Sequence, residues 1–179
     1  MFVWLLNASG GVNGVNTGNL GADWQILDGS ADHNGDGTSD LVMRQTNGDV
    51  SVWLMDGSNH VEKALPHLDN AGSLVSARGD YNADGISDVM WRHTDGTVLE
   101  WLMDSVGDVG ASNQFSVDTT WSIVDAVGDR DANGSSDVLW RSSGGTDERV
   151  FLWHMDPTSG SLASGHYVGG AVTSDWQIA

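Results

Sequence analysis

Residues 80–88 of this 179-residue chain read Asp-Tyr-Asn-Ala-Asp-Gly-Ile-Ser-Asp, and two close copies occupy 32–40 and 129–137. In each copy an oxygen-bearing side chain stands at positions 1, 3, 5 and 9, and glycine stands at position 6. Alternate residues of a tight loop can turn their side chains toward one point, and glycine lets the chain bend at positive φ. Ca²⁺ prefers six to eight oxygen ligands, so this spacing predicts a calcium-binding loop in three copies.

Two other interpretations of these loops were weighed. An EF-hand needs a bidentate Glu at position 12, where this chain has Met43, Trp91 and Trp140. Ordinary turns that bind nothing are the second alternative, because Asp, Asn and Gly favour turns by themselves. Three copies in one register argue against ordinary turns. The clustered carboxylates also argue against them, because the carboxylates would repel one another without a cation.

The loops belong to a longer repeat. Their first residues lie 48 and 49 positions apart. A second landmark recurs as Trp-Leu-Leu at 4–6, Trp-Leu-Met at 53–55 and 101–103, and Trp-His-Met at 153–155. Two landmarks with one period of about 48 to 50 residues indicate a repeat protein.

Each repeat contains four short segments typical of β-strands. The apolar run after each loop is followed by a turn such as Asn47-Gly48 or Asp95-Gly96, which favours a hairpin. We expect strands at 41–45, 50–55, 61–65 and 74–76, at 89–93, 98–103, 112–117 and 121–123, and at 138–142, 150–155, 166–168 and 176–178, besides the Trp-Gln-Ile segment at 24–26. Four antiparallel strands in about 50 residues make one propeller blade, so the fold class predicted is an all-β β-propeller, with a β-sandwich as the alternative.

The chain is expected to form a single propeller segment over 1–179. It divides into a partial blade at 1–27 and blades at 28–76, 77–124 and 125–179. This amounts to a partial ring of about 3.5–4 blades, whereas complete propellers usually have 4 to 8. We therefore expect the ring to be completed by the rest of a longer chain or by further copies in a homo-oligomer.

Composition excludes several classes of protein. Lys and Arg total 7 against 25 Asp and Glu, a net charge of −18, so nucleic acid is not an expected partner. The chain has no Cys, which excludes disulfides and thiolate metal sites. No apolar run approaches the roughly 20 residues that span a bilayer, so membrane insertion is not expected. Residues 1–6 lack a basic region and are not a signal peptide.

The segment from Gly79 to Val89, together with Met90-Trp91-Arg92 and the Trp-Leu-Met at 101–103, resembles the FG-GAP/VCBS-type repeats of integrin-α-like and bacterial extracellular β-propellers. The resemblance covers essentially the whole chain, although the FG and GAP signatures themselves are absent. It implies that each loop joins the outer strand of one blade to the inner strand of the next and holds one Ca²⁺.

The resemblance also implies the ligands, which are five residues in each loop. The three sets, with the seventh position contributing its carbonyl, are Asp32, Asn34, Asp36, Thr38 and Asp40; Asp80, Asn82, Asp84, Ile86 and Asp88; and Asp129, Asp131, Asn133, Ser135 and Asp137. In the third set the acid and the amide exchange places, which preserves the charge. About three calcium ions are therefore expected.

The functional expectation is a non-catalytic, calcium-binding module that is secreted or displayed on the surface of a bacterial cell, where it binds a protein or a glycan in adhesion. Two alternatives stay open: a structural component that self-assembles into a filament or surface layer, and a lectin or accessory segment of a polysaccharide-active enzyme. The chain contains no HExxH, Gly-x-Ser-x-Gly or phosphate-loop motif. No catalytic residue is therefore predicted.

Two recurring residue types have both a structural and a ligand-binding interpretation. Trp4, Trp53, Trp101 and Trp153 could be platforms for sugars, but their repeated strand position favours packing between blades. Arg44, Arg92 and Arg141 recur at the end of the first strand of each repeat and could bind anions or uronic acids, but we expect them to pair with a loop carboxylate or with a carbonyl of a neighbouring blade.

Overall fold

In a computed structural model, which describes residues 2–6, 11–16, 18–143 and 149–169, the chain is all-β, and those residues form no helix. Its strands are β1 (Phe2–Leu6), β2 (Val12–Asn16), β3 (Trp24–Ala31), β4 (Asp40–Gln45), β5 (Val50–Asp56), β6 (Asn59–Leu65), β7 (Gly72–Gly79), β8 (Asp88–His93), β9 (Thr97–Met103), β10 (Val109–Ser116), β11 (Trp121–Gly128), β12 (Asp137–Ser142), β13 (Val150–Met155) and β14 (Leu162–Tyr167). The strand expected at 176–178 lies outside the described residues.

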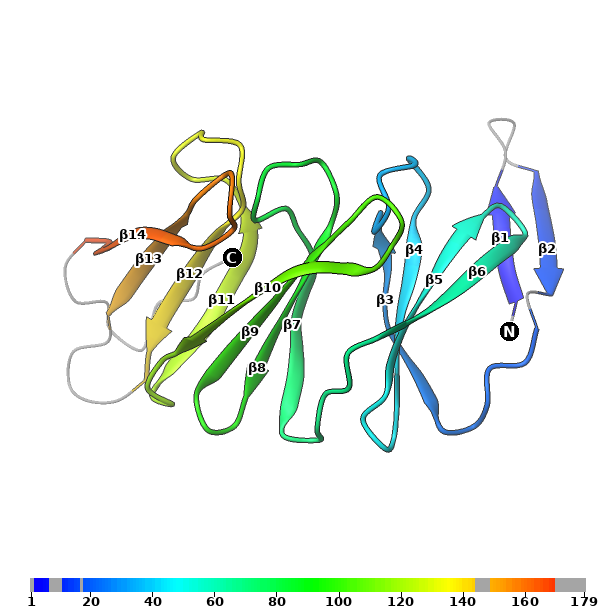
Figure 1. The fold of residues 1–179 in the computed structure, drawn as a ribbon, viewed down its shortest axis with the longest axis horizontal. Helices are drawn as coiled ribbons and strands as arrows, with labels where there is room; N and C mark the ends of the chain where they lie inside the picture. The colour runs from blue at the N-terminus through cyan, green and yellow to red at the C-terminus, as the bar shows by residue number, and fades with distance from the viewer. Residues whose placement is uncertain (1, 7–10, 17, 144–148, 170–179) are drawn as a thin grey trace.

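The strands form three four-stranded antiparallel sheets and one two-stranded sheet, each from consecutive strands. We call β3–β6, β7–β10 and β11–β14 the first, second and third sheets. Figure 1 shows them in a row that begins with the β1–β2 pair, and over the described residues this row is not closed. The predicted all-β fold with four strands per repeat is thus confirmed, and its repeat is visible as three similar sheets.

The position of the loops within a repeat differs from the expectation. The 32–39 loop joins β3 to β4, which pair with each other in one sheet from Trp24↔Gln45 to Ala31↔Asp40. The same holds for the loops between β7 and β8 and between β11 and β12. Each loop therefore closes a hairpin inside a sheet and does not join two sheets. The Trp-x-Ile type of strand begins a sheet, and the sheets span 24–65, 72–116 and 121–167.

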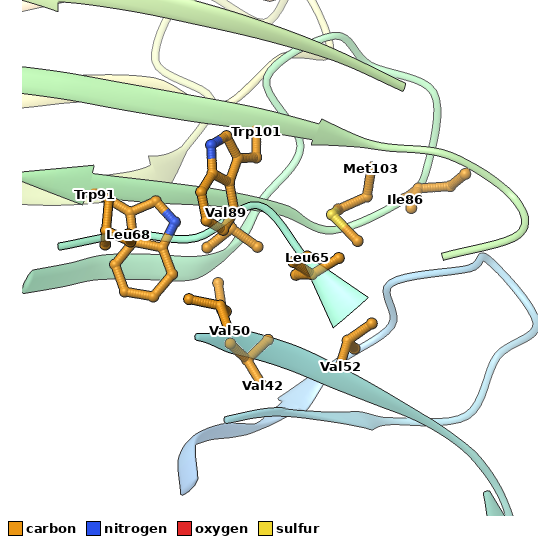
Figure 2. Close-up of a cluster of buried hydrophobic side chains, with 11 residues drawn as sticks. Val42, Val50, Val52, Leu65, Leu68, Ile86, Val89, Trp91, Trp101 and Met103 are labelled. Carbon is orange, nitrogen blue, oxygen red and sulfur yellow. The ribbon is translucent and has the colours of Figure 1, made fainter. Parts of the chain in front are cut away.

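The first and second sheets pack face to face. Val50 and Val52 of β5 face Trp91 of β8 and Trp101 and Met103 of β9 across the interface (Figure 2). Trp91 is fully buried, and truncating such a side chain to Ala costs about 3–5 kcal/mol in general. Most of the adhesion between these sheets is therefore apolar.

The second and third sheets repeat this packing. Val98 and Leu102 of β9 lie in one cluster with Trp140, Trp153 and Met155 of the third sheet. The rings of Trp53, Trp101 and Trp153 are all buried, which confirms the packing interpretation and leaves no open aromatic platform at these positions.

Arginine side chains tie the first and second sheets to the segment that leads into the next sheet. Arg44 donates to the carbonyls of Gly72 at 2.6 Å, of Leu68 at 3.0 Å and of Asp69. Arg92 donates to the carbonyl of Val117 at 3.0 Å. The preference for neighbouring carbonyls over an anionic ligand is thus confirmed for these two residues.

Glu100 is a buried carboxyl group between the second and third sheets. It replaces the apolar Val52 and Leu152 of the other repeats and is fully buried on β9. Asn113 Nδ2 donates to its Oε1 at 3.0 Å, whereas Oε2 has no hydrogen-bond partner among the described residues. Burial raises the pKa of Glu100 to about 8, opposed by the Asn113 hydrogen bond and assisted by the charge of Asp88.

Glu100 should therefore make the folded state lose stability as pH rises. The folded-state pKa lies above the ordinary value of 4.5, so its contribution is complete below about pH 4.5 and is lost as pH approaches 8. In Glu100→Leu, urea unfolding at pH 5 to 8 should show a gain over the wild type that grows with pH, by roughly 1 kcal/mol per unit. A difference between the two proteins that does not change with pH would contradict this.

Candidate metal centre

The three predicted loops lie on the same edge of the row of sheets, at the top of Figure 1. They are also bonded to one another. Ser87 N of the second loop donates to Asp32 O of the first at 2.8 Å, and Ser136 N of the third donates to Asp80 O of the second at 2.6 Å. The loops thus form a continuous chain of contacts across all three sheets.

The first carboxylate of each loop accepts hydrogen bonds from the loop backbone. Asp32 accepts from Gly35 N and Gly37 N, both at 2.7 Å. Asp80 accepts from Gly85 N at 2.9 Å, and Asp129 from Gly134 N at 3.0 Å. The loop therefore wraps around the side chain at position 1.

This wrapping needs two residues with left-handed backbone. At position 6, Gly85 has φ of 85°, as the sequence predicts for a glycine there. Position 4 has the same handedness, with φ of 57° at Ala83 and 61° at Ala132. Such angles are uncommon for non-glycine residues, so two of the loops hold a strained alanine.

The last carboxylate of each loop is buried and joins two segments. Asp88 is fully buried, and its two oxygens accept from Tyr81 N and from Met103 N, each at 2.8 Å. Asp40 and Asp137 accept equivalent pairs of hydrogen bonds. One donor of each pair is a backbone N–H of the same loop, and the other is a backbone N–H of the following strand, β5 or β13. Position 9 therefore anchors the loop to its own sheet.

Burial disfavours the ionised form of this acid in the first two loops. It raises the pKa of Asp88 to about 7, against the two N–H donors and with the nearby charges of Asp84 and Asp80. The pKa of Asp40 is raised in the same way by burial. A cation beside these loops would favour the ionised forms and relieve the repulsion.

Positions 3 and 5 meet at the exposed rim of the first and second loops. Asn34 Nδ2 donates to Asp36 Oδ2 at 3.0 Å, and Asn82 Nδ2 donates to Asp84 Oδ2 at 2.9 Å. Position 7 takes part through its N–H, since Thr38 N and Ile86 N donate to the position 5 carboxylates at 2.7 and 2.8 Å. Hydrogen bonds within each of these two loops thus bring the predicted ligands at positions 3, 5 and 7 next to one another.

The third loop is organised differently. Asp131 Oδ2 and Asp137 Oδ2 lie 3.2 and 3.3 Å from Nδ1 of His154, which comes from β13. Within the described ranges, these three are the one group of three acidic or imidazole side chains whose ligand atoms all lie within 4.8 Å of one another. The three carboxylates of the first loop and those of the second are not gathered so closely.

Sequence reasoning missed His154 and the residues at loop position 2. The repeat alignment holds a signal for His154, because Leu54 and Leu102 occupy its position in the other sheets. Position 2 shows no such pattern. His33 Nδ1 nevertheless donates to Ser87 O at 2.7 Å, and Tyr81 Oη donates to Ala126 O at 2.8 Å, so each crosses to the next sheet.

Comparison of the chain with protein-family models, with curated proteins and with solved structures found no match. Nor does the described part of the chain contain a helix with the length and apolarity that crossing a membrane requires.

Removing a position 9 carboxylate should destabilise the protein even without metal. In Asp88→Ala, the buried N–H groups of Tyr81 and Met103 lose their acceptor, so we expect a loss of about 3 kcal/mol in chelator. Asp84→Ala, at an exposed position of the same loop, should cost about 1 kcal/mol or less. Urea unfolding monitored by circular dichroism measures both, and equal losses would contradict the anchoring role.

Proposed function

We propose that this chain is a calcium-binding β-propeller repeat module, in which ions held by the loops stiffen a row of blades. The observation that carries the proposal is the hydrogen-bonded row of loops, Asp32 to Ser87 and Asp80 to Ser136, with repeated carboxylates at its junctions. An ion bound in one loop would therefore act on the contact between two sheets. The propeller assignment is supported by the successive four-stranded sheets packed face to face.

The charge of the loops supports a cation as the ligand. Residues 32–40 and 80–88 each hold three carboxylates and no Lys or Arg. In the second loop two of those acids, Asp80 and Asp88, have a pKa raised by burial. A divalent cation would offset the negative charge of the loop and favour the ionised form of the buried acids. The carboxylate, amide and backbone oxygens of the loops are the ligands that Ca²⁺ prefers.

We place the module outside the cell, since sites of modest affinity fill at millimolar extracellular calcium. The role we propose there is non-catalytic binding or adhesion toward a protein or glycan. The non-catalytic part of this proposal is supported by the loop carboxylates, because they accept hydrogen bonds from backbone N–H groups and so stabilise the fold.

Calcium should stabilise the protein, and Asp84→Ala should remove one site. At a free concentration 100 times the dissociation constant, one site contributes about 2.7 kcal/mol, so the melting temperature should rise with calcium and fall in chelator. Isothermal titration calorimetry should count one ion fewer in Asp84→Ala than in the wild type.

The matched control is Asp95→Ala, which removes an exposed turn carboxylate that accepts from Thr97 N outside the loops. Its calcium stoichiometry should equal that of the wild type. Unchanged stoichiometry in Asp84→Ala, or a wild type indifferent to calcium, would refute the assignment of this loop.

A second candidate is a structural role in self-assembly, favoured by the row of sheets that stays open over the described residues. Multi-angle light scattering in millimolar calcium and after chelation tests it. If copies complete the ring, the mass should be a multiple of 19.0 kDa in calcium and should fall toward 19.0 kDa in chelator. A monomer under both conditions would eliminate this candidate.

A further inference from the structure

We propose that Asp131, Asp137 and His154 form a site for a borderline divalent transition metal of the Zn²⁺ type. This inference goes beyond the proposed function, because it uses neither of the first two loops. At the third loop, a metal that accepts a nitrogen ligand would bind in place of calcium.

The geometry of the three donor atoms suits such an ion. His154 Nδ1 lies 3.2 Å from Asp131 Oδ2 and 3.3 Å from Asp137 Oδ2. Zinc–nitrogen and zinc–oxygen bonds of about 2.0–2.2 Å at tetrahedral angles separate two ligand atoms by about 3.3–3.6 Å. An ion can therefore enter with small side-chain adjustments, and a solvent molecule can complete its coordination.

The donor types favour a transition metal over calcium. Calcium takes oxygen ligands, whereas imidazole nitrogen together with carboxylate is a typical zinc donor set. In the first and second sheets Leu54 and Leu102 occupy the position of His154, so this strand position offers a nitrogen donor beside its loop in the third repeat alone of the three. Replacement of a leucine by a ligating residue beside a loop of acids is the sequence difference that carries the inference.

Asn133 of the third loop makes hydrogen bonds within the protein through both ends of its amide. The two lone pairs of Asn133 Oδ1 accept from Ser135 N at 2.7 Å and from Ser135 Oγ at 2.6 Å. Its Nδ2 donates to Met155 O at 3.0 Å. Ser135 therefore supplies two donors to the amide oxygen that the resemblance offers to calcium.

The surrounding contacts hold the donors in place. Asp137 is fully buried and accepts from Arg130 N at 2.8 Å and Met155 N at 3.2 Å, which fixes the plane of its carboxylate. The His154 ring stacks on His166 of β14, with ring centroids 5.1 Å apart and an interplanar angle of 24°. Orientation of first ligands by such outer contacts is typical of metal sites in proteins.

The test uses the full chain and His154→Leu, which restores the residue of the other two repeats and should fold. Calorimetric titration with Zn²⁺ should show one site in the wild type that His154→Leu weakens at least about tenfold, the loss that even an outer-shell partner causes. Co²⁺, used as a spectroscopic probe, should give visible ligand-field bands in the wild type that are absent from His154→Leu.

The matched control is His67→Asn, which removes an exposed histidine whose Nδ1 lies 3.0 Å from Asp49 Oδ1. It should bind Zn²⁺ as the wild type does. Equal Zn²⁺ affinity in wild type and His154→Leu would overturn the proposal and reduce the cluster to an ion pair of His154 with two acids. Complete displacement of Zn²⁺ by equimolar Ca²⁺ would overturn it as well.

If His154→Leu fails to fold by circular dichroism, the wild type alone decides. Zn²⁺ should then shift the imidazole NMR signals of His154, and unshifted signals would overturn the proposal. Calcium titration of Asp84→Ala reports separately on the second loop. A wild type that binds calcium but not Zn²⁺ defeats this inference alone, and a wild type that binds Zn²⁺ but not calcium defeats the proposed function alone.

Discussion

The buried carboxylate that ends each loop is the interaction on which the rest of the molecule depends. Asp88 accepts one hydrogen bond from a backbone N–H of its own loop and another from a backbone N–H of β9. A single side chain therefore holds the hairpin loop against the strand that follows β8. Because the loop is held there, Tyr81 can reach the neighbouring sheet and donate to Ala126 O. Burial raises the pKa of the same carboxylate to about 7, and a cation bound in the loop as we propose would favour its ionised form.

Most of the architecture could be predicted from the sequence because it repeats. The period, the hairpin turns and the aromatic strand positions each recur, so all-β sheets of four strands followed from pattern alone. The place where one sheet ends could not be predicted, since a linear repeat can be divided at any of its loops. Hydrogen-bond pairing between β3 and β4 is what assigns the loop to the inside of a sheet.

The loop geometry could be predicted where it obeys the repeat and was missed where it departs from it. The carboxylates at positions 1 and 9 accept backbone hydrogen bonds, and the glycine at position 6 has a positive φ. His154 and Glu100 each break the repeat, and a departure has no period by which to recognise its role. The strained alanines at position 4 were equally hidden, because Ala83 carries no sign in its side chain that its backbone is left-handed.

The row of loops has a consequence for cooperativity. Each sheet touches only its neighbours, so stability approximates a sum of nearest-neighbour terms, as in solenoid proteins. The second loop is the one bonded on both sides, through Ser87 to the first loop and through Asp80 to the third. Disorder that starts there breaks two of these loop contacts at once, whereas disorder in either flanking loop breaks one. The middle repeat therefore links the other two along this edge.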